Sequence, residues 1–139
     1  MNSVKERLFS VGLLVLRLGA GGLLIYGHGW GKITKFAERA PKFADPIGLG
    51  PETSFALVVF AEVFCAAAVM LGLGTRFAAV PIVIFTAVAV FVQHAADPFS
   101  DKEKALLFAV PMLTLIFTGG GRYSLDAAIG RMRRGRRAS

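Results

Sequence analysis

The stretch FAAVPIVIFTAVAVFVQHAA, which runs from Phe77 to about Ala96, contains no Asp, Glu, Lys or Arg. A helix needs about 20 mostly apolar residues to cross the ~30 Å hydrocarbon core of a bilayer. This stretch therefore predicts a transmembrane helix. The whole chain of 139 residues is 55% hydrophobic and only 18% charged, which is a poor balance for the surface of a water-soluble domain.

Three further stretches are also apolar enough to predict transmembrane helices. The stretch from about Leu8 to Trp30 has Arg17 as its only charged residue, and the stretch from about Thr53 to Leu73 has only Glu62. A shorter one runs from about Ala105 to Thr118, and we expect it to extend at both ends. The sequence thus predicts an all-α integral membrane protein, an antiparallel four-helix bundle.

The connections between these stretches support that topology. Residues 31–52 contain prolines and glycines among mixed charges and predict a loop, while Gly72–Thr75 is a tight break that forces its two flanking helices to be antiparallel neighbours. We assign residues 1–121 to the transmembrane domain. Residues 122–139 predict a basic tail with a short amphipathic helix that lies on an anionic leaflet.

The basic residues give the orientation. A net charge of +7 and a pI near 10.2 raise the question of nucleic-acid binding. The Lys and Arg residues gather at the termini and in loops between apolar runs, a placement typical of membrane orientation signals, and we expect no nucleic-acid partner. Nine lie on the side of the termini and six on the other side, which predicts that both termini are cytoplasmic.

Arg17 and Glu62 are the charged residues expected at membrane depth. Such a group costs at least ~2.5 kcal/mol and usually faces a partner or a cavity. Their distances from the predicted cytoplasmic ends of their helices are similar, so we expect them to meet. They then form either a structural salt bridge or a catalytic pair in which Glu62 carries a proton and Arg17 lowers its pKa.

His28 and His94 are the only histidines, and both lie near the outer ends of their helices. On an α-helix, Arg17 and His28 share one face, with Lys32 one turn further. Three interpretations of these polar residues remain open. They form a quinone head-group site, a haem or metal site with His28 and His94 as ligands, or a hydrogen-bond network without a ligand.

Small residues and the single cysteine complete the pattern. Gly27 and Gly31 form a small-xxx-small spacing that predicts close approach of another backbone, and a homo-oligomer is compatible with such a contact. Cys65 lies within an apolar run, so it provides neither an internal disulfide nor a cysteine metal cluster.

Taken together, the polar motifs resemble the DoxX family of small four-helix bacterial membrane proteins, and the resemblance covers nearly the whole chain. The motifs that carry it are Leu16-Arg17-Leu18, Tyr26-Gly27-His28-Gly29 with Lys32, Ala61-Glu62, LGLGTR at 71–76, His94, and GGGRYSLD at 119–126.

The resemblance implies redox chemistry in the bacterial cytoplasmic membrane, because relatives are linked to thiosulfate oxidation with quinone as acceptor. We expect a subunit that binds a quinone or a haem near the outer end of the bundle and works with a soluble oxidoreductase. The alternatives are a non-enzymatic scaffold for such an enzyme and a small proton-coupled exporter. The positions that match the family motifs are Arg17, His28, Lys32, Glu62, Arg76 and His94.

Overall fold

The computed structural model describes residues 3–138, and every regular element within that range is helical. Gly72 and Gly119 follow the ends of two of the helices, and Pro51 begins another. The elements are α1 (Ser3–Leu24), η1 (Ile25–Gly29), α2 (Trp30–Thr34), α3 (Phe36–Arg39), η2 (Ala40–Lys42), α4 (Pro51–Val59), η3 (Phe60–Cys65), α5 (Ala66–Leu71), α6 (Thr75–Val88), η4 (Ala89–Gln93), α7 (Phe99–Thr118) and α8 (Leu125–Ala138).

Three continuous helices in the described chain are long and apolar enough to cross a membrane: Ser3–Thr34, Pro51–Leu71 and Thr75–Gln93. Each combines several of the elements above, because π-helical turns interrupt the α-helices without breaking them. These helices confirm the all-α fold and three of the predicted spans. The fourth, α7, packs along α6, but its first turns carry four charged residues at 101–104.

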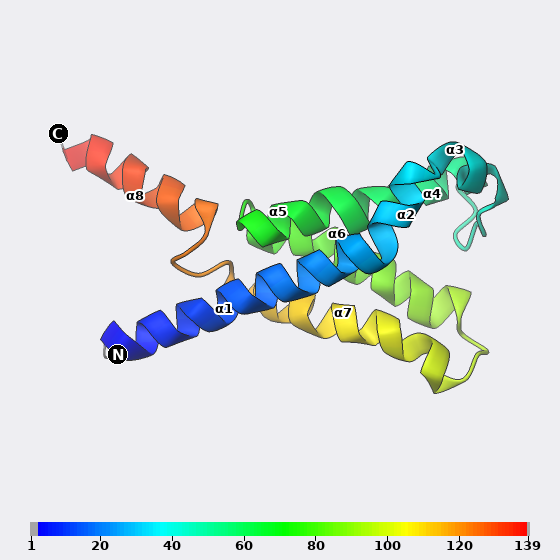
Figure 1. Ribbon diagram of the computed structural model, residues 1–139, viewed down its shortest axis with the longest axis horizontal. Coiled ribbons are helices and arrows are strands. Elements are labelled where there is room, and N and C mark those ends of the chain that lie inside the picture. Colours follow the sequence, from blue (N-terminus) through cyan, green and yellow to red (C-terminus); the bar gives the residue numbers. More distant parts are fainter. Residues whose placement is uncertain (1–2, 139) are drawn as a thin grey trace.

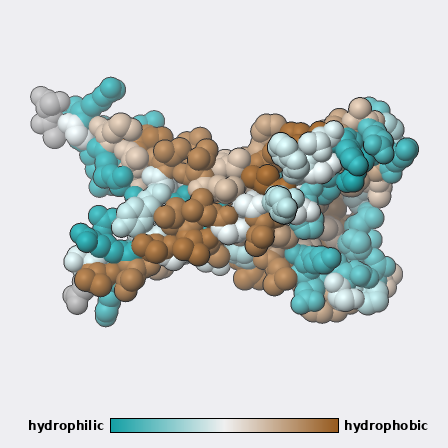
Figure 2. Space-filling view, in the orientation of Figure 1, coloured by the Kyte–Doolittle hydropathy of each residue, from teal (hydrophilic) through white to brown (hydrophobic). Residues whose placement is uncertain are grey.

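The helices run up and down along the long axis of the molecule, so α8 returns to the end at which α1 starts, although the two helices diverge there (Figure 1). The start of α1 and the α8 helix are at one end of the molecule, while α2, α3 and the turn between η4 and α7 are at the other. Between the two polar ends lies an apolar band (Figure 2). Large apolar side chains point outward along this band, as lipid contact requires, and they include Val15, Leu23, Phe77, Ile84, Phe91 and Phe117.

Arg17 joins three segments of the chain at the end of the molecule where α1 starts and α8 lies. Its side chain is fully buried. One guanidinium nitrogen donates to the carbonyl oxygens of Met70 at 2.8 Å and Val69 at 3.4 Å, and the other donates to the Tyr123 carbonyl at 3.0 Å. The last carbonyls of a helix lack partners within the helix and favour a cation nearby. Arg17 thus ties α1 to the end of α5 and to the loop before α8.

Asp126, in the first turn of α8, connects the same region to the start of α6. Its carboxylate accepts hydrogen bonds from the backbone N–H of Gly74 at 2.7 Å and from the N–H and hydroxyl of Thr75 at 3.0 Å each. It therefore acts as an N-cap for α6 supplied by another part of the chain. Gly72 has φ +71°, and a Cβ there would lie 2.4 Å from the Ser124 Cβ, so glycine is needed in this turn.

Replacing Arg17 with Met should lower the free energy of unfolding by about 3 kcal/mol, because carbonyls at a buried helix end lose their donor. Thermal unfolding of the detergent-solubilised protein measures the loss. Arg7→Met, on the exposed part of the same helix, removes the same charge and should change stability by less than about 0.5 kcal/mol. Equal unfolding temperatures for the two variants would contradict the role of Arg17.

Asp126 should give stability a specific dependence on pH. Partial burial raises the pKa of its carboxyl, but the hydrogen bonds from Thr75 and Gly74 and the charge of Arg17 outweigh that effect, so the pKa lies below its usual value. The unfolded value is near 3.9, so the contribution is complete above about pH 4 and disappears as the pH falls through the folded pKa.

Asp126→Asn should therefore be less stable than the wild type by about 1 kcal/mol at pH 7, and this difference should shrink below about pH 4. Unfolding temperatures of both proteins between pH 3 and pH 7 test it. A difference that stays constant over the whole range would show that the carboxylate charge does not contribute.

Candidate functional site

A buried ion pair lies between the first two long helices, away from the chain termini. The Nζ of Lys32, on α2, lies 2.6 Å from both carboxylate oxygens of Glu62, on η3. The Glu62 side chain is only 1% exposed and that of Lys32 is 20% exposed. Of the two partners, only the lysine is therefore partly accessible at the surface of the helices. Lys32 also lies 5.6 Å from the centre of the Phe85 ring, which places it within cation–π range.

The predicted pairing of Arg17 with Glu62 is therefore wrong. Each has its own partners, backbone carbonyls for Arg17 and Lys32 for Glu62. The prediction assumed that the first two helices end at the same level. In the structure, Arg17 is level with Met70 near the end of α5, and Glu62 lies eight residues, or about 12 Å, further along its helix.

π-helical turns decide which side chains face this site. In the described chain, η1 contains His28, η3 contains Glu62, and η4 ends one residue before His94. A π turn inserts one extra residue, and such turns are frequent at functional sites. After the buried Leu24, the next buried position is therefore Gly29 rather than His28. The predicted face shared by Arg17 and His28 is lost, and Lys32 is brought to Glu62 instead.

The close backbone contact in this region is at Gly29. A Cβ at Gly29 would lie 2.7 Å from the Val63 Cγ2 and 2.9 Å from the Glu62 carbonyl oxygen. A Cβ at Gly27 or Gly31 would have no neighbour within 4 Å. The predicted helix contact through Gly27 and Gly31 is thus wrong within this chain, because the π turn directs Gly29 toward η3.

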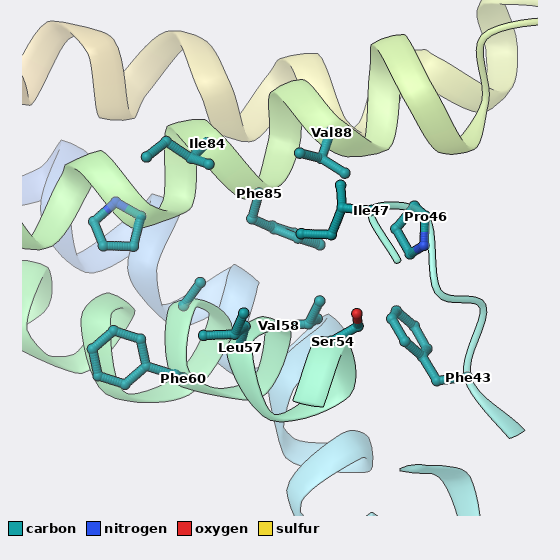
Figure 3. Close-up of a pocket in the computed structure, with 12 residues that line it drawn as sticks. Phe43, Pro46, Ile47, Ser54, Leu57, Val58, Phe60, Ile84, Phe85 and Val88 are labelled. Carbon is teal, nitrogen blue, oxygen red and sulfur yellow. The ribbon is translucent and has the colours of Figure 1, made fainter. Parts of the chain in front are cut away.

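An apolar pocket of about 330 Å³ opens beside the ion pair, between α4, α6 and the loop after η2 (Figure 3). Ile84, Phe85 and Val88 line it from α6, and Leu57 and Val58 line it from α4. The loop supplies its remaining wall with Phe43, Pro46 and Ile47.

Asp45 holds this loop in place. Its carboxylate accepts hydrogen bonds from the Ser54 hydroxyl at 2.7 Å and from the backbone N–H groups of Leu49 and Gly50. These bonds, with that from Ser54 the strongest, hold the pKa of Asp45 below its usual value. The loop is thereby fixed to the start of α4, and the pocket wall is ordered.

A smaller pocket of about 250 Å³ adjoins the first and shares Phe43, Pro46, Val58, Phe85 and Val88 with it. Its other lining residues include Lys32, Gln93 and His94. The His94 Nδ1 lies 2.7 Å from a carboxylate oxygen of Asp97, which orients the imidazole. The two pockets together form a cavity with apolar walls and hydrogen-bonding groups at one end.

The remaining predicted site residues lie elsewhere. His28 lines a different pocket, between α1 and α7, and its ring packs edge-on against Phe108 at 5.4 Å. Arg76 is exposed in the first turn of α6, next to Gly119 at the end with the chain termini. The structure therefore brings together Lys32, Glu62 and His94 and leaves Arg17, His28 and Arg76 apart. Among residues 3–138, no group of three or more His, Cys, Asp or Glu is placed to hold a metal ion.

Sequence analysis missed the partnership of Lys32 with Glu62. Lys32 follows the predicted apolar stretch, where a basic residue is usually taken as an interfacial anchor. The one signal for its inward position is the dense run of glycines around residues 27–31, which permits both the close contact at Gly29 and an irregular helix.

Long apolar helices with internally paired charges define a small helical membrane protein. A family model, DoxX, matches residues 12–95, and the chain belongs to the DoxX family. The chain is 31% identical over 127 residues to a protein of Escherichia coli (strain K12) named "Inner membrane protein YqjF", an alignment that covers 87% of this chain and 94% of that protein. No solved structure matches the chain significantly.

The contact at Gly29 gives a matched pair of substitutions. Gly29→Ala should destabilise the protein by about 1–3 kcal/mol, because the new methyl group overlaps Val63 and the Glu62 carbonyl. Gly27→Ala, two residues earlier, meets open space and should be neutral or slightly stabilising. Thermal unfolding in detergent compares them. Equal stability of the two variants would show that η1 and η3 do not pack as described.

Proposed function

We propose that this protein is a redox-associated membrane subunit that binds a quinone in the cavity beside Lys32 and Glu62. The observation that carries the proposal is the ion pair itself. A buried carboxylate holds a lysine in place, and that lysine lines a cavity whose walls are apolar apart from a few polar residues, among them Gln93 and His94. A lipophilic molecule with a polar head matches such a cavity.

The donor set fits a quinone head group. Quinone oxygens accept hydrogen bonds, and the polar end of the cavity offers the Lys32 ammonium and the Gln93 amide. His94 lines the same end, with its imidazole oriented by Asp97. The apolar walls between α4 and α6 suit an isoprenoid tail, and many of their residues face the surrounding lipid.

A bound quinone supplies two-electron redox chemistry, and the residues around it handle protons and position. Glu62 holds the Lys32 ammonium in place through both of its carboxylate oxygens, and Lys32 in turn donates a hydrogen bond to a carbonyl oxygen of the head group. His94 is suited to pass a proton between the head group and the polar end of the molecule. Because Cys65 is buried and is the only cysteine in the chain, we assign the donation of electrons to a soluble oxidoreductase partner.

The proposal also includes the membrane in which the protein lies and the way the chain crosses it. We place it in the bacterial cytoplasmic membrane, since a relative that aligns with most of the chain is named an inner membrane protein. We take α7 as a fourth span, because it packs along α6 and exposes Leu107, Val110 and Phe117. The larger number of basic residues at the end with the chain termini supports cytoplasmic termini.

The geometry supports quinone binding better than haem binding, proton-coupled export or a role as a scaffold without a ligand. His28 and His94 line different pockets, which gives no support to a haem held by both. A proton-coupled exporter needs a carboxylate that is free to exchange protons with its cargo, and Glu62 is held by Lys32. A scaffold without a ligand needs no lysine at the end of an apolar cavity.

The test uses Lys32→Met and, as a matched control, Lys35→Met, which removes an exposed lysine three residues later. Each protein is reconstituted in nanodiscs with ubiquinone, washed, and its retained quinone is quantified by mass spectrometry. Lys32→Met should retain at least about tenfold less than wild type, because a charge-assisted hydrogen bond contributes about 1.5–3 kcal/mol. Lys35→Met should match wild type.

Loss of the cation leaves Glu62 buried without its partner, so Lys32→Met can also destabilise the fold. The double variant Lys32→Met/Glu62→Gln removes both charges, should fold better than the single variant, and should still bind quinone weakly. A wild-type protein that retains no quinone above empty nanodiscs, or a folded double variant that binds like wild type, contradicts the proposal.

A further inference from the structure

A second pocket, of about 590 Å³, lies between α1 and α7 and shares no lining residue with the cavity beside Lys32. The two helices cross near the middle of the molecule and diverge toward the end that holds His28 (Figure 1). The pocket occupies that divergence. Small residues, Gly19 and Ala20, line it on α1, and Leu107, Phe108 and Pro111 line it on α7.

One end of this pocket is basic. His28 and Lys104 lie there, and Phe108 supports the imidazole through an edge-on ring contact at 5.4 Å. No carboxylate lines the pocket, and within residues 3–138 neither His28 nor Lys104 forms an ion pair. Lys32 differs in this respect, because Glu62 neutralises it. The pocket thus offers the positive charge of Lys104, which forms no ion pair within residues 3–138, and a neighbouring imidazole that can donate a hydrogen bond.

The length of the pocket matches one leaflet. On the first helix the pocket is lined from Val15 to His28, thirteen residues apart or roughly 20 Å along the helix, close to half of a ~40–45 Å bilayer with its headgroup regions. The basic end lies near α2 and the start of α7, at one of the two polar ends of the molecule (Figures 1 and 2), and Gly19 and Ala20 lie at least about two turns earlier on the first helix. A molecule with a hydrocarbon chain and an anionic head fits both parts of the pocket.

We infer that this pocket binds one anionic phospholipid, such as phosphatidylglycerol. One acyl chain lies between α1 and α7 over Gly19, and the phosphate lies beside His28 and Lys104. The charge complementarity selects an anionic head over a zwitterionic one. This site is independent of the quinone cavity, since the two have no lining residue in common.

The glycines of α1 provide the test. A Cβ at Gly19 or at Gly12 would have no neighbour within 4 Å, so both sites accept a larger side chain without overlap. Only Gly19 lines the pocket. Gly19→Leu therefore fills the space for the acyl chain, while Gly12→Leu adds the same side chain to the same helix outside the pocket.

Each protein is purified from membranes containing phosphatidylglycerol and phosphatidylethanolamine, and the bound lipid is identified by native mass spectrometry. Wild type and Gly12→Leu should retain phosphatidylglycerol, and Gly19→Leu should retain at least about fivefold less. His28→Gln/Lys104→Gln should lose the preference for phosphatidylglycerol. The double variant Lys32→Met/Glu62→Gln, which removes both charges of the other site, should leave this retention unchanged, which separates the result from that for quinone.

Three outcomes would overturn the inference. Equal retention of the two phospholipids by wild type would show that charge does not select the ligand. Retention by Gly19→Leu equal to that by Gly12→Leu would show that no acyl chain occupies the pocket, and would leave a phosphate ion as the only ligand of the basic end. Loss of bound quinone, rather than of phospholipid, in Gly19→Leu would assign the pocket to a different ligand.

Discussion

The fully buried guanidinium of Arg17 is the constraint on which the rest of the structure depends. Its hydrogen bonds to carbonyls of α5 and of the loop before α8 fix three segments that are far apart in the sequence. Asp126 adds the start of α6 to the same cluster. A charge at this depth is tolerable because it donates hydrogen bonds to carbonyl oxygens at the end of α5 and in the loop before α8. The helices are thereby held together at one end.

The other end of the molecule is built differently. There the buried charge of Glu62 is neutralised by a lysine that remains partly exposed, and π turns in three long helices direct polar groups toward the same region. The cavity beside Lys32 therefore opens at this end, whereas near Arg17 the backbone at Gly72 and Gly120 packs so closely that a Cβ would overlap its neighbours. The closed end provides stability, and the open end provides the space and the hydrogen-bonding groups that a ligand needs.

The length and apolarity of the helices predicted the fold, and the motif residues predicted the family. The partners of the buried charges were not predictable in the same way. Pairing Arg17 with Glu62 required knowing how far one helix extends past its neighbour, and that offset is set by long-range contacts such as the one between Arg17 and Met70. The position of His28 was wrong because a regular α-helix was assumed, and one π turn rotates everything that follows it.

The two pockets near this end differ in the charge of their surroundings. Lys32 and Lys104 both lie beside apolar pockets, but Glu62 balances only the first. A cation with a buried counter-ion favours a neutral, hydrogen-bonding head group, because a fully anionic head would also meet the carboxylate behind it. A cation without one favours an anion. The placement of a single glutamate on η3 therefore gives the two pockets different electrostatic surroundings.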